Sequence, residues 1–344
     1  MTAKQDLKDL SLEELEKLTS TLGLKPYRAK QIFQWLYQKH AHSIEKMTDL
    51  SKDIRKMLSE NSYIGHLTLK RVDQSKDNSK KFLFETSDHN GIESVLIPEK
   101  NHWTLCISTQ IGCPMKCRFC FTGEKGLLRN LSASEILNQV GTVLKTDNFK
   151  DKLPNIVFMG MGEPLSNYEN TVKSIRTLLS PWGFNFSHRK ITVSTAGLIP
   201  QMKQLSIDLP VNLAISLNAP NNKIRNRLMP VNKKFPIEDL INIAKNYPIS
   251  KRKRITFEYI LIKDINDSDE NAYELAEILK GFPCKINLIP FNEHPAASFK
   301  QPDEDRITKF RAILLEKKYT APIRRSKGSD IAAACGQLGK SINN

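Results

Sequence analysis

The sequence predicts an α/β protein whose core is an incomplete barrel of six strand–helix units, a (β/α)6 arrangement. Two observations predict it. From residue 101 to residue 320, apolar runs of strand length alternate with helical patterns, whereas residues 1–64 show helical patterns only. Residues 65–100 instead alternate apolar and polar side chains, which indicates a short antiparallel β extension between the two parts. Residues 321–344 are predicted to form a C-terminal tail.

The net charge of the chain favours a polyanionic partner. Lys and Arg number 52 against 37 Asp and Glu, which gives +15 at pH 7. Two basic runs, Lys251–Arg254 and Arg324–Lys327, carry part of the excess. A solvated surface is the simpler explanation for such charges, but an excess of this size favours nucleic acid.

The N-terminus and the cysteine count argue against a membrane or secreted protein. Charged residues begin at Lys4, and no apolar run approaches the ~18 residues that a spanning helix needs. Three of the six cysteines fall within eight positions, which does not resemble a secreted disulfide framework. We therefore expect a cytoplasmic protein in which cysteines serve metal and redox chemistry.

Short helices are predicted within residues 1–64, which we interpret as an accessory domain of the RNA-binding type. Ser11 and Glu14 have the spacing of a capping box, and Pro26 begins a second helix. A third amphipathic helix is expected over residues 50–58. One face of the second helix is apolar: Ile32, Phe33, Leu36 and Tyr37.

The β extension is predicted from three alternating stretches, at residues 67–69, 81–85 and 92–97. We interpret them as a small antiparallel sheet that links the helical domain to the barrel. Glu93 lies in the last of these strands between apolar residues. From the pattern alone, its carboxylate is expected to face solvent.

The barrel is predicted from strands and helices that alternate along the chain. The six expected strands are 102–108, 156–159, 190–194, 211–217, 255–261 and 285–289. The expected helices are 134–145, 168–179, 199–205, 237–245, 269–280 and 303–317. In a barrel of this kind the active site lies at the carboxyl ends of the strands, so polar residues that follow a strand are candidates for the site.

Cys113, Cys117 and Cys120 follow the first barrel strand with the spacing C-x3-C-x2-C. Three cysteines can bind three irons of a [4Fe-4S] cluster and leave the fourth iron open to a substrate. This spacing indicates the cluster loop of a radical S-adenosylmethionine (SAM) enzyme. A zinc site is the alternative, but zinc sites usually add a second Cys or His pair, which is missing here.

Polar and glycine residues follow later strands. The string from Met159 to Pro164 ends the second strand, and it includes Gly162 and Glu163. Glycine allows close approach of a ligand, and a carboxylate can bind the α-amino group of SAM. Further candidates, each with the alternative of a satisfied turn residue, are Ser194, Thr195, Ser216, Leu217, Asn218 and Asn292.

Three cysteines lie outside the triplet. Cys284 begins a buried-looking strand and is expected to act as a small hydrophobic residue. Cys106 lies in the first barrel strand, and Cys335 lies in a small-residue segment of the tail beside Gly336. A mobile reactive thiol fits the position of Cys335, but spacing alone does not pair these cysteines.

Together these strings resemble the RlmN/Cfr family of radical SAM RNA adenosine methyltransferases, and they are most similar to its RlmN branch. The resemblance extends over nearly the whole chain. The strings that carry it are Ile92–Glu99, Cys106, the cysteine triplet, Met159–Pro164, Leu228–Asn232 and Ala333–Leu338.

The resemblance implies a role for each candidate residue. Cys113, Cys117 and Cys120 match the cluster ligands. Cys335 matches a thiol that is methylated during turnover, Cys106 a second catalytic thiol, and Glu93 a proton acceptor. The SAM contacts match Gly162, Glu163, Ser194, Ser216, Leu217, Asn218 and Asn292. At position 218 the family pattern leads us to expect His, so that contact departs from the pattern.

The resemblance also implies a reaction. We expect methylation at C2 of an adenosine in the peptidyl-transferase centre of 23S rRNA and of the adenosine 3' to the anticodon in some tRNAs. One [4Fe-4S] cluster, two SAM per turnover, a methylated Cys335 and a 5'-deoxyadenosyl radical belong to this expectation, with an electron donor such as flavodoxin. A monomer is expected. The alternatives are Cfr-like methylation at C8 and an RNA-binding protein with a structural iron or zinc site.

Overall fold

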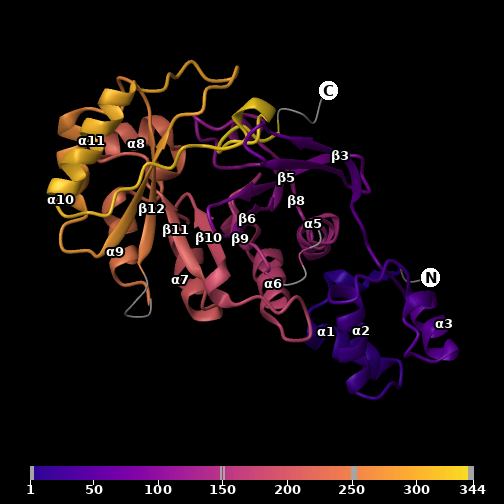
Figure 1. Ribbon diagram of the computed structural model, residues 1–344. Helices are drawn as coiled ribbons and strands as arrows, with labels where there is room; N and C mark the ends of the chain where they lie inside the picture. Colours follow the sequence, from indigo (N-terminus) through magenta and orange to yellow (C-terminus); the bar gives the residue numbers. More distant parts are fainter. Residues whose placement is uncertain (1–3, 148, 150–151, 249–253, 340–344) are drawn as a thin grey trace.

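A computed structural model describes residues 4–147, 149, 152–248 and 254–339 (Figure 1). The N-terminal part contains three helices, α1 (Leu12–Thr21), α2 (Tyr27–Tyr37) and α3 (Lys52–Asn61). Two short parallel strands, β1 (Gln5–Asp6) and β2 (Ser62–Tyr63), pair its two ends. These helices lie at one end of the molecule, beside α5 and α6 (Figure 1). Residues 1–64 were predicted to be helical, and three helices lie in this part of the chain.

The N-terminal helices form where the sequence predicts them. Ser11 and Glu14 make the capping box in both directions, so two helix-terminal N–H groups are satisfied. The apolar face of α2 is buried, including Phe33 and Tyr37. The hydroxyl of Tyr37 donates to the carbonyl of Lys8 at 3.0 Å, which fixes α2 against the first residues of the chain.

The barrel sheet contains nine hydrogen-bonded strands in the order β13-β12-β11-β10-β9-β6-β5-β4-β3. From β6 to β13 all neighbours are parallel, as predicted for an incomplete six-stranded barrel. These six strands are β6 (Trp103–Cys106), β9 (Asn155–Phe158), β10 (Ile191–Thr195), β11 (Asn212–Ser216), β12 (Ile255–Leu261) and β13 (Cys284–Pro290).

The antiparallel strands are not the separate small sheet that the sequence predicts. They are β3 (Thr68–Gln74), β4 (Lys80–Glu85) and β5 (Gly91–Pro98), and they continue the barrel sheet. Strand β5 pairs with β6, with Val95 opposite Cys106. The antiparallel strands join the barrel sheet because β6, its first strand, would otherwise have unpaired main-chain N–H and C=O groups along one edge. As a result, Glu93 lies near Cys106.

Helices cover the outside of the barrel strands. They are α5 (Ala133–Thr146), α6 (Tyr168–Leu179), α7 (Ile199–Asp208), α9 (Ile237–Lys245), α10 (Asp269–Ile278) and α11 (Glu304–Glu316). The predicted positions agree within a few residues. The sequence reading missed four short elements: β7 (Gln110–Gly112), α4 (Phe121–Glu124), β8 (Leu127–Asn130) and α8 (Asn222–Leu228). Single-turn helical segments are η1 (Leu7–Asp9), η2 (Ile44–Lys46), η3 (Pro164–Asn167), η4 (His188–Lys190), η5 (Pro230–Lys233) and η6 (Ser329–Ile331).

The apolar core lies between the sheet and these helices. Its parallel strands are buried on both faces, which is why they read as nearly continuous apolar runs. Cys284 is 3% exposed within this core and acts as a small hydrophobic residue, as expected. In the described part of the chain, no helix is long and apolar enough to cross a membrane. Of the basic run Lys251–Arg254, the first three residues lie outside the described residues.

Candidate active site

The cysteine triplet lies in the loop of a two-stranded hairpin, β7 with β8, at the end of β6. The amide of Cys113 donates to the carbonyl of Gly126 at 2.8 Å, and this bond closes the base of the loop. Gly112 has φ +78°, and a Cβ there would come 1.8 Å from the carbonyl oxygen of Gly126. Only glycine permits this approach, so the local sequence dictates where the loop begins.

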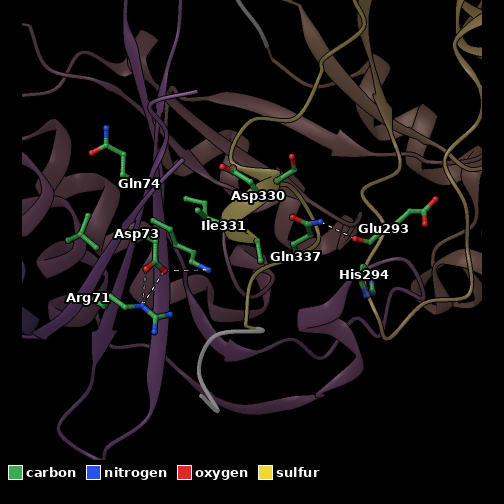
Figure 2. A pocket seen from close by; sticks show the side chains of 12 residues that line it. Arg71, Asp73, Gln74, Glu293, His294, Asp330, Ile331 and Gln337 are labelled. Carbon is green, nitrogen blue, oxygen red and sulfur yellow. Dashed lines mark hydrogen bonds and ion pairs between the residues drawn. The ribbon is translucent and has the colours of Figure 1, made fainter. Parts of the chain in front are cut away.

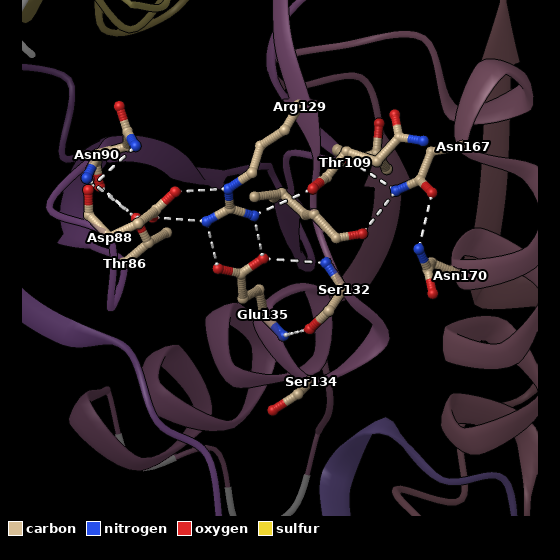
Figure 3. A network of polar contacts seen from close by, with 12 residues as sticks. Thr86, Asp88, Asn90, Thr109, Arg129, Ser132, Ser134, Glu135, Asn167 and Asn170 are labelled. Atoms are coloured by element: carbon tan, nitrogen blue, oxygen red, sulfur yellow. Dashed lines mark hydrogen bonds and ion pairs between the residues drawn. The ribbon is translucent and has the colours of Figure 1, made fainter. Parts of the chain in front are cut away.

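Arg129 on β8 fastens the hairpin to the body of the protein (Figure 3). Its guanidinium forms two hydrogen bonds of 2.8 Å with Glu135 on α5. It also forms two of 2.7 Å with Asp88, in the turn between β4 and β5. Two bidentate carboxylate pairs on one guanidinium fix its position closely. The cysteine loop is therefore held by a side chain outside the motif that the sequence suggested.

A cavity of about 150 Å³ opens at the carboxyl ends of the parallel strands. Ten of the predicted site residues line it: Cys113, Cys117, Cys120, Gly162, Glu163, Ser194, Thr195, Ser216, Asn218 and Cys335. The structure thus brings Cys335 together with the cysteine triplet and with Gly162 and Glu163, although Cys335 follows the triplet by more than 200 residues in the sequence.

Glu163 is held rigidly at the wall of this cavity. It is 4% exposed, and its two carboxylate oxygens accept the amides of Ala196 at 2.7 Å and Leu165 at 3.1 Å. Burial raises the pKa of Glu163 to about 7, while these two hydrogen bonds act in the opposite direction. Gly162 has φ +101°, and a Cβ there would lie 2.5 Å from the Cβ of Gln110. Because Gly162 has no side chain, the segment Met159–Pro164 can pass close to β7.

Asn218 has φ +57°, a conformation that Asn adopts more readily than most residues. Its side-chain oxygen accepts the amide of Ile260 at 2.9 Å, and its amide group donates to the sulfur of Met229 at 3.3 Å. The side chain is 1% exposed and joins the ends of two strands. Asn at this position therefore has a structural task besides any contact with SAM.

Arg225 on α8 is a site residue that the sequence reading missed. It is 0% exposed and donates to the carbonyls of Ala196 at 2.7 Å, Ser216 at 3.1 Å and Leu217 at 3.1 Å. These carbonyls belong to two strand ends that the sequence had singled out. Burial lowers the pKa of Arg225 to about 10, and the thiolate form of Cys117 acts in the opposite direction. A buried arginine cannot be recognised from a short polar helix alone.

A second cavity, of about 530 Å³, adjoins the first. Both are lined by Cys120, Glu258, Arg324 and Cys335, whereas Cys106 lines only the second. Burial raises the pKa of Cys106 to about 12, and the nearby thiolate of Cys335 adds to the shift. Both catalytic thiols predicted from the resemblance therefore face one space, which lies next to the cysteine triplet. All six cysteines are free.

The basic run Arg324–Lys327 is divided between the cavities and the surface. Arg324 lines both cavities, and the thiolate form of Cys335 raises the pKa of its guanidinium. Arg325 pairs with Glu304 at 2.6 Å, and its side chain is 63% exposed. Lys327 lies 3.8 Å from Glu99. The contribution of this run to nucleic-acid binding stays a prediction.

The tail that carries Cys335 is fastened on both sides. Asn292 donates to the carbonyl of Cys335 at 2.9 Å, and the amide of Phe121 donates to the carbonyl of Gly336 at 2.8 Å. Figure 2 shows the outer side, where the side-chain amide of Gln337 donates to the carbonyl of Glu293 at 3.0 Å. The predicted contact of Asn292 with SAM stays a prediction, since Asn292 does not line the cavity of the triplet.

Glu93 does not face solvent, so the interpretation from strand alternation was wrong. Its side chain is 0% exposed and lies 3.3 Å from the ammonium of Lys81, which is 1% exposed. The other carboxylate oxygen accepts the amide of Gly339 at 2.6 Å. Tail residues cover this face of the sheet, and strand alternation cannot report such a cover. Leu217 is likewise fully buried and can reach the site only with its main chain.

The three cysteines of the triplet lie in one loop and line one cavity. Three thiols that converge from one loop are a donor set that suits a [4Fe-4S] cluster, in which each cysteine would bind an iron of its own. Burial raises the pKa of Cys113 to about 12, and such thiols bind as thiolates when a metal compensates the charge.

Comparisons with known families divide the chain as its structure does. Residues 5–64 match the family model "Ribosomal RNA large subunit methyltransferase N-terminal domain". Residues 107–276 match the "Radical SAM superfamily" model. The first match coincides with the N-terminal helices, and the second contains the cysteine triplet together with Glu163 and Arg225.

Curated relatives resemble the chain over nearly its full length. A "Dual-specificity RNA methyltransferase RlmN" of Syntrophus aciditrophicus is 51% identical over 98% of this chain and 97% of the relative. A protein with the same name from Desulfosudis oleivorans is 48% identical over 98% and 91%. The crystal structure of a radical SAM methyltransferase from Sphaerobacter thermophilus superposes with a TM-score of 0.91 at 44% identity, over 97% of this chain and 98% of that one.

Proposed function

Because the chain belongs to the RlmN family of radical SAM RNA methyltransferases, we propose that it methylates C2 of adenosine in 23S rRNA and in certain tRNAs. One observation carries this proposal: Cys106 and Cys335 face one cavity beside the cysteine triplet. A generic radical SAM enzyme needs the triplet, but it does not need two further thiols there. A methyl carrier that must later be released needs both.

The cofactors are proposed on the same residues. Cys113, Cys117 and Cys120 would hold a [4Fe-4S] cluster, and Glu163 would bind the amino group of SAM beside it. When bound, the cluster and SAM supply the 5'-deoxyadenosyl radical that polar chemistry at an adenine carbon lacks. Glu163 suits its task because its two hydrogen bonds with main-chain amides fix the carboxylate within the cavity wall.

Cys335 carries the methyl group in this proposal. Its thiolate attacks the methyl group of one SAM, so a sulfur–carbon bond forms and S-adenosylhomocysteine leaves. A hydrogen atom would then pass from that methyl group to the 5'-deoxyadenosyl radical, which becomes 5'-deoxyadenosine, and the carbon radical left on Cys335 would add to C2 of the adenosine. The positive guanidinium of Arg324, which lines the same cavities, stabilises the attacking thiolate.

Release of the RNA needs Cys106 and a base. After the C2 proton is removed by Glu93 or Cys106, the adduct radical gives up one electron, which the cluster would accept, and the Cys106 thiolate attacks the sulfur of Cys335. The carbon–sulfur bond then breaks, a proton completes the methyl group on C2, and methylated RNA leaves. A disulfide between the two cysteines remains for later reduction by two electrons. Burial of Cys106 disfavours its thiolate until a base acts, which protects the methyl carrier before the RNA is joined.

The experiment that tests this function is anaerobic reconstitution of the chain with iron, sulfide, SAM and a reductant such as reduced flavodoxin. Transcripts of rRNA and tRNA are then added, digested to nucleosides and examined by mass spectrometry. We expect 2-methyladenosine. Formation of 8-methyladenosine instead would support Cfr-like chemistry, and no methylated adenosine in either RNA would contradict the proposal.

A further inference from the structure

A cavity of about 600 Å³ lies away from the cysteine triplet, where the N-terminal part of the chain meets helix α5. The N-terminal part contributes Lys8, Tyr37, His40 and His42 to its walls. Helix α5 contributes Asn138 and Lys145, among others, and the N-terminal helices lie beside this helix in Figure 1. None of these residues has a role in the proposed reaction.

The polar walls of this cavity are basic. Lys8, Lys145, His40, His42 and His66 line it, and no carboxylate does among the residues that the structure describes. The ammonium of Lys145 donates to Nε2 of His42 at 2.9 Å. That of Lys8 donates to the side-chain oxygen of Asn138 at 2.6 Å. Both acceptors are neutral, so these bonds leave two positive charges on the cavity wall.

The pKa shifts of these groups reflect their burial and the repulsion between the basic side chains. Burial lowers the pKa of Lys8 to about 8, although Asp6 acts in the opposite direction. Burial also lowers the pKa of His40, and the charges of Lys8 and Lys145 lower it further. The pKa of His42 falls through burial and the charge of Lys145. An anion in the cavity would relieve this repulsion.

The shape of the cavity selects among anions. Its floor is apolar and aromatic, with Tyr37 and Phe184 buried and the ring of His40 6.2 Å from that of Phe184. Its rim is exposed at His42, His66 and Lys145. A basic rim over an aromatic floor suits one phosphate of a polymer together with its attached sugar, because the polymer can continue over the rim.

We propose that this cavity binds a backbone phosphate of the RNA substrate, remote from the target adenosine. The inference rests on the proposed function, which makes RNA the substrate. One part of the cavity comes from the segment that matches the N-terminal methyltransferase domain, and another part comes from the radical SAM segment, while His66 and Leu67 lie between the two matches. The site therefore exists only where the two segments are joined, and it explains a use for the N-terminal helices in RNA binding.

The test compares Lys145→Ala with Lys280→Ala in the full, reconstituted chain. Lys280 is an exposed lysine two residues after the end of α10. Helix α10 lies at the other end of the molecule from the N-terminal helices (Figure 1). Each variant removes one positive charge, so non-specific attraction changes equally. Dissociation constants for a target hairpin transcript are measured at several salt concentrations. Loss of one phosphate contact at ~0.1 M salt is expected to weaken binding about 5- to 10-fold and to reduce the salt slope by about 1.

The positional test uses hairpins in which one phosphate at a time is replaced by a neutral methylphosphonate. In the unmodified chain, we expect one position outside the target loop to weaken binding when neutralised. In Lys145→Ala, neutralising that same phosphate should weaken binding no further. In turnover assays this variant should show a higher KM and an unchanged kcat. His42→Ala should behave in the same way, which guards against a folding artefact of one substitution.

Three outcomes would overturn the inference. In the first, Lys145→Ala binds the transcript as tightly as Lys280→Ala does. In the second, no phosphate position weakens binding in a way that depends on Lys145. Inorganic phosphate could also bind the cavity, seen as a shift of the His42 ring resonances, while RNA affinity stays independent of Lys145. In each case the adenosine could still be methylated, so the proposed function would survive. If the unmodified chain binds no transcript, the proposed function itself fails.

Discussion

At the scale of single residues, the ion pair of Glu93 and Lys81 deserves the closest test. Both side chains are almost fully buried, and their charged atoms lie 3.3 Å apart. Asp73 lies 4.0 Å from the same ammonium, at the edge of the cavity shown in Figure 2. Burying a carboxylate costs free energy unless an opposite charge pairs with it. Lys81 supplies that pairing charge for Glu93.

Lys81→Met is expected to destabilise the fold by about 3–5 kcal/mol, since it leaves the Glu93 charge buried without its partner. Urea unfolding of the chain measures this change. The matched control is the double variant Lys81→Met/Glu93→Gln, which should recover most of the lost stability. A loss below about 1 kcal/mol in the single variant would show that the pair does not act in this way.

Lys8 predicts a dependence of stability on alkaline pH. Its pKa is about 8 in the folded chain, against the ordinary value of 10.5. The folded state therefore releases this proton at lower pH than the unfolded state does. The free energy of unfolding is therefore highest above pH 10.5, where Lys8 is neutral in both states. It falls as pH decreases from 10.5 to about 8, because Lys8 gains its proton first in the unfolded state. The fall amounts to about 3 kcal/mol across this window.

The measurement is urea unfolding between pH 7.5 and 10.5. The chain should gain stability relative to Lys8→Met as pH rises, because the variant lacks the titrating group. Equal slopes for the two proteins would contradict the assignment of the shift to Lys8. The same experiment tests the phosphate cavity. An anion bound there would raise the pKa of Lys8 and would therefore reduce the difference in pH dependence between the unmodified chain and Lys8→Met.

At the scale of elements, the hairpin β7–β8 depends on Arg129. Arg129→Lys keeps the charge but cannot make two bidentate pairs with Asp88 and Glu135. We expect a loss of about 1–2 kcal/mol in stability. We also expect a lower content of iron and sulfide after reconstitution, because the loop that holds the cysteines is less fixed. Unchanged iron content would show that the hairpin forms without this fastening.

Much of the fold could be predicted at this scale, and the reasons for the failures are physical. Mainly apolar runs such as residues 255–261 predicted β12 correctly, because strands buried on both faces carry few polar residues. Helix α8 has only seven residues and presents polar side chains, so periodicity did not reveal it. Hairpin β7–β8 was missed because each of its strands has three or four residues.

The candidate site was predictable where a motif carries the chemistry itself. The triplet and Glu163 were found from spacing and residue type, and they share a cavity. Arg225, Arg324 and the pairing of Lys81 with Glu93 were not found, since their roles depend on elements distant in the sequence. Sequence patterns report which face of an element is buried, but they do not report what a distant tail places upon it.

At the scale of the whole molecule, the charge of +15 predicts that RNA binding depends on salt. If about two to four phosphates are contacted, affinity for the transcript should fall about 10- to 100-fold between ~50 and ~200 mM salt. Affinity for SAM, measured in the same buffers, should change little and serves as the control. Salt-independent RNA binding would mean that the basic surface has no part in recognition.

The arrangement of the whole chain gives the tail a place in the proposed reaction. The N-terminal helices and the β extension lie on one side of the barrel, and the tail returns to it (Figure 1). There Cys335 lines the same cavity as Cys106. Hydrogen bonds from Asn292 and Phe121 hold the tail in place. The thiol proposed as methyl carrier thus comes from the far end of the sequence.

The measurement that tests the central claim most directly is turnover of Cys106→Ala with RNA under anaerobic conditions. Without the second thiol, RNA joined to Cys335 cannot be released. We predict that protease and nuclease digestion of this variant yields the peptide containing Cys335 carrying a covalently attached adenosine. Free methylated RNA at the rate of the unmodified chain, with no such peptide, would contradict the account.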